Sequence, residues 1–407
     1  MIFPCRCVSE KGPVKSVINK IDGLKRGRPS PGNILEKQLL VGAFCAAVFM
    51  LLHFAPEAAA GTVYNRRATA TAQLLAGIIP ASGDPVLDRL VTSTAWDEHR
   101  RWMADQWSQA RLRLFAMAKW RARELHLSSP ERRTLLYPFS GPDFLNAYVL
   151  FPNHQKYVFF SLERPGVLPD LESVTPHQFV KLLQDVRNAF HDIFQRNYFI
   201  TDYMTKQLTT PWIRGTVPVM ATMMALMGQR ILRIEPVDLF PELSRSYEAR
   251  DAKRPRRIMR GVRIDFMNTE STPQQLYYFS VDATDKALAF YPNFLGWVGQ
   301  NRPATALIKS ASYLLHDNQF TETRAMILSA ADVVIEDDTG IPYRYFRHSP
   351  WHVRLYGQYH KPIKGLGFGY QADLEAAYKA KPNLAPLPFP FGYHWRGQKS
   401  GLLIADR

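Results

Sequence analysis

The most chemically suggestive residues are three consecutive acids, Glu336, Asp337 and Asp338, which are followed by Thr339 and Gly340. Carboxylates gathered at one turn can act as general acid and base or bind a cation. The same residues are also typical of an ordinary turn, because Asp side chains accept hydrogen bonds from nearby backbone N–H groups and glycine readily adopts a positive φ. The pattern favours a turn role for Glu336 and Asp337 and leaves Asp338 as the best candidate for a functional acid.

Four aromatic residues come shortly after this cluster: Tyr343, Tyr345, Trp351 and Tyr356. Together with Glu336 they are candidates for ligand binding, because aromatic faces beside carboxylates suit sugar rings. The same aromatic residues would suit the core of a sheet equally well.

Asp143 is a further candidate catalytic acid, together with Asp337 and Asp338. It follows the segment Tyr137-Pro-Phe-Ser-Gly-Pro and opens a predicted helix right after a predicted strand. That position corresponds to the carboxyl end of a strand, where α/β sheets keep their sites. The alternative is a capping role, with Ser140 as the N-cap and Asp143 three residues later.

No pattern of metal ligands stands out. Four methionines recur at i, i+3, i+4 and i+7: Met220, Met223, Met224 and Met227. Thioethers on one helix face could hold Cu(I), but their apolar neighbours favour a buried helix. His348, His352 and His360 lack zinc-helix spacing and favour a scattered surface set. We therefore predict no metal and no cofactor.

Several catalytic and binding motifs are absent from the sequence, including H-E-x-x-H, G-x-S-x-G, the Walker loop and G-x-G-x-x-G. No specific nucleic-acid motif is present either. The net charge of +15 and a basic segment at 250–260 indicate a surface that tolerates anionic neighbours, such as anionic envelope components.

The hydrophobic patterning predicts a mixed fold, α/β or α+β, in which an N-terminal helical region packs on a mixed sheet. Helices are expected at 95–126, 175–195, 216–227, 320–330 and 371–380. Strands are expected at 156–162, 231–234, 262–266, 276–281 and 351–356, and a hairpin is expected from 333–336, a turn at 337–340 and 341–346. Residues 137–153 and 277–293 align without gaps, which suggests a weak internal duplication.

The N-terminal part carries an export signal. Leu39 to Leu52 is uncharged and apolar, basic residues precede it, and Ala58-Ala59-Ala60 follows it. This pattern predicts a signal peptide cleaved after Ala60, or alternatively an anchor formed by residues 39–55. Residues 1–37 form a basic tail before the apolar run. All three cysteines precede residue 61, so the globular part has no disulfide. We expect a helical region at 61–130 and a globular α/β domain at 131–407.

The chain resembles a family of exported bacterial hypothetical proteins with no assigned activity. The resemblance rests on SGPDFLNAY (140–148), YYFSVDATD (277–285), SASYLLHD (310–317), IEDDTGIPYRYF (335–346) and LYGQYHKPI (355–363). It implies export and a single domain, and it supplies no catalytic residues. The sequence thus favours an envelope module in the periplasm or at the cell surface that binds glycan, glycolipid or a partner protein. A hydrolase of an envelope polymer with paired carboxylates is the alternative.

Overall fold

The computed structural model describes residues 65–237 and 259–407, apart from 349, 382 and 397–398. The predicted signal segment, the tail before it, the three cysteines and most of the basic segment at 250–260 lie outside the described residues. None of the described helices is long and apolar enough to cross a membrane.

The predicted mixed α/β fold is confirmed: the described strands form one nine-stranded sheet, in the order β3-β4-β5-β2-β1-β6-β7-β9-β8. Its centre is parallel and consists of β5 (Pro273–Ser280), β2 (Lys156–Ser161), β1 (Thr134–Pro138), β6 (Ala304–Ile308) and β7 (Ala331–Glu336). The flanks are antiparallel and consist of β3 (Arg230–Val237), β4 (Arg260–Met267), β8 (His352–Gly357) and β9 (Gly401–Asp406).

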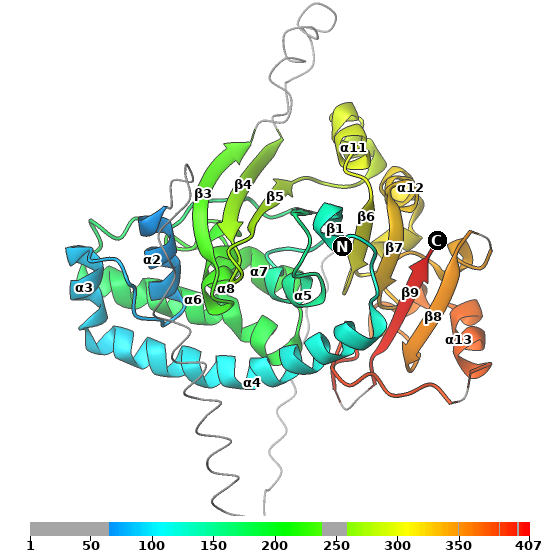
Figure 1. Cartoon of the computed structure of the whole chain (residues 1–407), viewed down its shortest axis with the longest axis horizontal. Helices are drawn as coiled ribbons and strands as arrows, with labels where there is room; N and C mark the ends of the chain where they lie inside the picture. The colour runs from blue at the N-terminus through cyan, green and yellow to red at the C-terminus, as the bar shows by residue number, and fades with distance from the viewer. Residues whose placement is uncertain (1–64, 238–258, 349, 382, 397–398) are drawn as a thin grey trace, which may run out of the picture. The chain divides into compact units, whose positions relative to one another are not determined.

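Two apolar layers cover the sheet, because successive side chains of a strand point to opposite faces. Leu135 and Tyr137 belong to one layer, and Leu136 between them belongs to the other. The first layer contains α2 (Arg66–Leu75), α3 (Pro85–Val91), α4 (Thr94–Glu124), α5 (Phe144–Leu150), α6 (Pro176–Arg196), α7 (Thr201–Gln207) and α8 (Val217–Leu226). The second contains α10 (Asp285–Leu288), α11 (Pro292–Gly299), α12 (Thr321–Ala330) and α13 (Ala372–Lys379). Figure 1 shows α11, α12 and α13 in the half of the view that holds β6, β7, β8 and β9.

The longest predicted helices form close to their expected bounds. In α6 the predicted capping box is present, since Thr175 accepts from the backbone of Gln178 and the Gln178 side chain accepts from the backbone of Thr175. In α8 the side chains of Met220, Met223 and Met224 are fully buried, as the apolar neighbours predicted.

The predicted hairpin at 333–346 is wrong. β7 forms as expected, but residues 341–346 form no strand, and only a short 3-10 turn spans Tyr343–Tyr345. The antiparallel partner of β7 is instead β9, at the end of the chain. Gly340 also lacks the positive φ expected of the turn.

The cap predicted for α5 is also wrong in its residue. Asp143, rather than Ser140, is the N-cap, and its side chain accepts from the backbone N–H of Asn146 at 3.2 Å.

The two segments of the suggested internal duplication, 137–153 and 277–293, both form a strand followed by a helix. The helices lie in different layers, however, with Phe144 of α5 in the first and Leu288 of α10 in the second.

The strand order contains a reversal that positions the site. From β1 the chain moves to β2 on one side, and after β5 it crosses to β6 on the other side of β1. The carboxyl ends of β1 and β6 therefore flank a topological switch point, where open α/β sheets bind ligands.

Candidate functional site

Polar residues follow three neighbouring parallel strands at the edge where those strands end, which we call the carboxyl edge. Asp143 lies after β1, Lys309 and Ser310 come directly after β6, and Asp337 and Asp338 come directly after β7. The fold thereby brings the predicted carboxylates Asp143, Asp337 and Asp338 to the same edge of the sheet.

A buried ion pair spans the switch point. The Nζ of Lys309 lies 2.8 Å from Oδ2 of Asp143, and both side chains are almost fully buried. Tyr137 Oη donates to the same oxygen at 2.9 Å, and Asn146 donates to both oxygens of Asp143. Burial lowers the pKa of Lys309, and the charges of Asp143 and Asp337 oppose that shift. Asp143 is thus a structural anchor between β1 and β6.

Asn197 ties this pair to the helical layer. It ends α6 in the left-handed conformation, with φ of 73°, and its backbone oxygen accepts from Lys309 Nζ and from Asn146. Its side chain donates to the backbone oxygen of Pro390 at 2.7 Å. The C-terminal segment is therefore fastened to the same network.

Asp337 is held on both of its oxygens. Oδ2 accepts from the backbone N–H of Ser310 at 3.0 Å, and Oδ1 accepts from the backbone N–H and the hydroxyl of Thr339. The predicted turn role is present in the bonds to Thr339, but the bond to Ser310 also joins the ends of β6 and β7. Burial raises the pKa of Asp337, and the donated hydrogen bonds and Lys309 oppose that shift.

Glu336 is a buried acid with a structural contact. Its Oε2 accepts from the backbone N–H of Ile341 at 2.8 Å. Burial raises its pKa well above the usual value, and the backbone N–H of Ile341 opposes that shift. A Cβ on Gly340 would lie 2.2 Å from this oxygen, which gives the physical reason for glycine at that position.

Asp338 differs from its two neighbours because it is only partly buried. The hydroxyl of Tyr313 donates to its Oδ2. Burial, and after it the charge of Asp337, raises the pKa of Asp338 to about 7. A carboxyl group with that pKa exchanges its proton readily at neutral pH.

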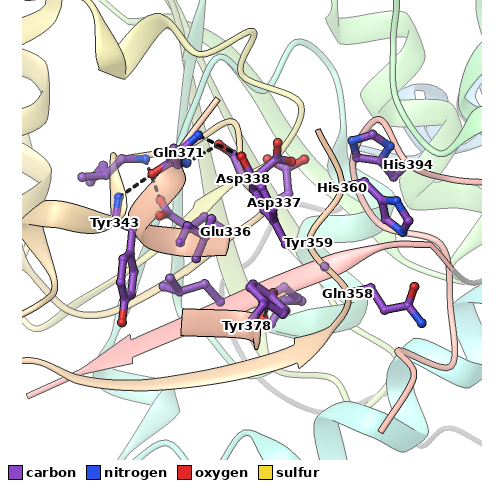
Figure 2. Close-up of a pocket in the computed structure, with 15 residues that line it drawn as sticks. Glu336, Asp337, Asp338, Tyr343, Gln358, Tyr359, His360, Gln371, Tyr378 and His394 are labelled. Carbon is purple, nitrogen blue, oxygen red and sulfur yellow. Dashed lines mark hydrogen bonds between the residues drawn. The ribbon is translucent and has the colours of Figure 1, made fainter. Parts of the chain in front are cut away.

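Asp338 faces a small pocket together with Glu336 and Asp337. Figure 2 shows Gln371 bridging two of its walls, accepting from the Tyr343 backbone at 2.7 Å and donating to the Asp338 backbone oxygen at 2.8 Å. About 10 Å³ is open to the centre of a water-sized sphere, which is room for about one water molecule.

The predicted aromatic candidates do not gather at this pocket. Tyr343 lines it. Tyr345 lies against Arg324, and Trp351 lies against Phe346 and Arg407. Tyr356 packs in the other layer against Trp120, and its hydroxyl donates to Glu124 at 2.9 Å. No flat aromatic surface forms from these four residues.

The three histidines considered as metal ligands, His348, His352 and His360, lie in two different environments. His348 and His352 are exposed, as the sequence predicted. His360 lines the pocket beside His394, with ring centroids 5.4 Å apart, and burial lowers the pKa of both. Among the described residues, no group of three His, Cys, Asp or Glu side chains could hold a metal ion.

Sequence reasoning missed several members of the site: Asn146, Asn197, Lys309, Ser310 and Tyr313. One signal was available, since Lys309 follows the apolar run Ala304–Ile308 directly. A charged residue at the end of a buried strand indicates the carboxyl edge of a parallel sheet.

Comparison with protein-family models, curated proteins and solved structures found no match to this chain.

Proposed function

We propose that the protein is an exported hydrolase of envelope material and that Asp338 is its acid–base residue. The observation that carries the proposal is the position of Asp338, partly exposed at the carboxyl edge, with its pKa raised to about 7. General acid–base catalysis is most effective when the catalytic pKa lies near the working pH.

The reaction follows from these groups. Protonated Asp338 donates its proton to the leaving oxygen of an ester or glycosidic bond as that carbon–oxygen bond breaks. A water molecule adds to the carbon, and the proton that the water loses returns to Asp338. The pocket has room for about one water beside this carboxyl group.

The other acids support Asp338. Asp337 is a positioning residue, because it is buried, held by three donors, and acts on the substrate only through its neighbour's pKa. Asp143 and Lys309 fix the strands beneath it. The dispersal of Tyr345, Trp351 and Tyr356 favours this proposal over an aromatic glycan-binding surface.

The test is release of soluble products from isolated cell envelopes, followed by mass spectrometry. Asp338→Asn should lower the rate at least a hundredfold, because general acid–base catalysis contributes roughly 10²–10⁴-fold. Glu336→Gln is the matched control and should retain activity, because the amide oxygen of Gln can still accept the bond from Ile341. An Asp338→Asn protein with wild-type turnover would refute the assignment.

A further inference from the structure

A second, much larger groove lies at the carboxyl edge, away from Asp338. Its volume is about 1240 Å³, larger than the roughly 300–1,000 Å³ of ordinary small-molecule sites. Leu162 directly follows β2, Val237 ends β3 and Arg260 begins β4, so the groove lies over the half of the sheet that β1, β6 and β7 do not occupy.

Close backbone contacts build the wall of this groove. Gly166 has φ of +68°, and a Cβ there would lie 1.3 Å from the backbone oxygen of Arg214. Gly215 has φ of +106°, and a Cβ there would lie 2.4 Å from the backbone oxygen of Arg164. The backbone of Val217 also donates to Pro165 at 2.8 Å. The two segments are therefore fixed against each other before any ligand binds.

Three exposed arginines line the groove: Arg164, Arg214 and Arg260. Among the described residues, none of the three forms an ion pair with a carboxylate. Among the described residues of the lining, the one acid is Glu163, which accepts from the hydroxyl of Ser161 at 2.5 Å. Exposed guanidinium groups are suited to phosphate and carboxylate, which they can bind with two parallel hydrogen bonds.

The lining also contains several aliphatic side chains, beside the threonines Thr205, Thr209 and Thr210. Leu162 and Val167 are 64% and 65% exposed, and Leu208, Val237 and Met259 continue the apolar surface. No described residue of the lining is aromatic, so stacking of sugar rings or nucleobases does not fit this groove. Exposed aliphatic side chains gain free energy when an alkyl chain covers them.

From this combination we infer that the groove binds a lipid with an anionic headgroup, the acyl chain on the aliphatic wall and the headgroup on the arginines. The inference goes beyond the proposed function, because the groove and the pocket at Asp338 share no lining residue and lie over different halves of the sheet.

The experiment measures binding of decyl phosphate to the full-length chain by calorimetry, below the concentration at which micelles form. Decyl maltoside carries the chain without the charge, and inorganic phosphate carries the charge without the chain. We expect decyl phosphate to bind at least tenfold more tightly than either. Replacing Arg164, Arg214 and Arg260 together by Gln should weaken its binding at least tenfold.

The matched control replaces three exposed cations of α4, Arg111, Lys119 and Arg123, by Gln and should bind as the wild type does. Leu162→Ser should also weaken binding, whereas Val180→Ser, at another exposed position on α6, should not. These substitutions are at the surface, so circular dichroism should report unchanged folding.

Three results would overturn the inference: no binding by the wild type, equal losses in the groove and α4 variants, or tighter binding of poly-glutamate than of decyl phosphate. The outcome is separable from the proposed function. Asp338→Asn should leave decyl phosphate binding unchanged, so a groove that binds without any turnover would refute the hydrolase and retain the lipid site.

Discussion

At the scale of single residues, the three consecutive acids have three different environments. Glu336 is buried with a raised pKa, Asp337 is buried and held by donors, and Asp338 is partly exposed with a pKa of about 7. Burial and the neighbouring charge decide which of them can exchange a proton, and the residue type does not.

The raised pKa of Asp338 has a consequence for stability. The folded protein keeps this proton up to about pH 7, whereas the unfolded chain loses it near the ordinary value of 3.8. The unfolded state therefore binds fewer protons between these values, and stability falls as the pH rises through that window. Asp338→Asn removes this loss, and Tyr313 can still donate to the amide oxygen. Its melting temperature relative to wild type should rise from pH 4 to pH 7 and then level off. A difference independent of pH would contradict the raised pKa.

Asp337→Asn should be destabilising, contrary to the near-silent effect that a simple turn predicts. Both oxygens of Asp337 accept from backbone N–H groups, so either orientation of the amide directs its NH₂ group at another donor. The expected cost is about 1–3 kcal/mol in the free energy of unfolding. Urea denaturation of Asp337→Asn beside Glu336→Gln would measure it, and equal midpoints for the two variants would count against this account.

At the scale of elements, local patterns predicted what local interactions build. The long helices α4 and α6 carry their own periodicity and caps, so their bounds could be read from neighbouring residues. β6 was missed because it is a short strand, Ala304–Ile308, that is buried on both faces. Such a strand lacks the alternation of apolar and polar residues that predicts a half-buried strand. The hairpin was wrong because β9, distant in sequence, takes the place beside β7.

The same limit applies to the site. Asp143, Asp337 and Asp338 were recognisable as acids at predicted strand ends. The Lys309–Asp143 pair was not, because it depends on β6 crossing to the far side of β1. Contacts across a topological switch point join residues that are far apart in the chain, so the spacing of residues in the sequence cannot predict them.

The methionine helix gives a prediction at this scale. Met220, Met223 and Met224 of α8 are fully buried in the first layer. Met223→Ala should destabilise the fold by about 2–5 kcal/mol through lost burial and a cavity. Met227→Ala, at a partly buried position, is the control and should cost less. Chemical denaturation compares the two, and an equal cost would argue against α8 as core.

At the scale of the whole molecule, the proposed catalytic pocket and the proposed lipid-binding groove both lie at the carboxyl edge of the sheet. The pocket at Asp338 and the arginine-lined groove lie over opposite halves of the carboxyl edge. The net charge of +15 favours approach to an anionic surface, which agrees with the proposed lipid.

Export is the prediction that belongs to the whole chain. The basic flank, the apolar run Leu39 to Leu52 and Ala58-Ala59-Ala60 predict a mature protein beginning at Gly61. Cell fractionation followed by N-terminal sequencing checks this. A full-length chain held in the membrane fraction would support the anchor alternative, and full-length protein in the cytosol would contradict export.

The central claim is that Asp338 is a carboxyl group that titrates near neutral pH at the carboxyl edge. Its most direct test is a ¹³C NMR titration of the side-chain carboxyl carbons, with the Asp338 signal assigned by its loss in Asp338→Asn. The account predicts a midpoint of about 7 for that signal. A midpoint near the ordinary value of 3.8 would contradict it, because Asp338 would then carry no proton to donate at neutral pH.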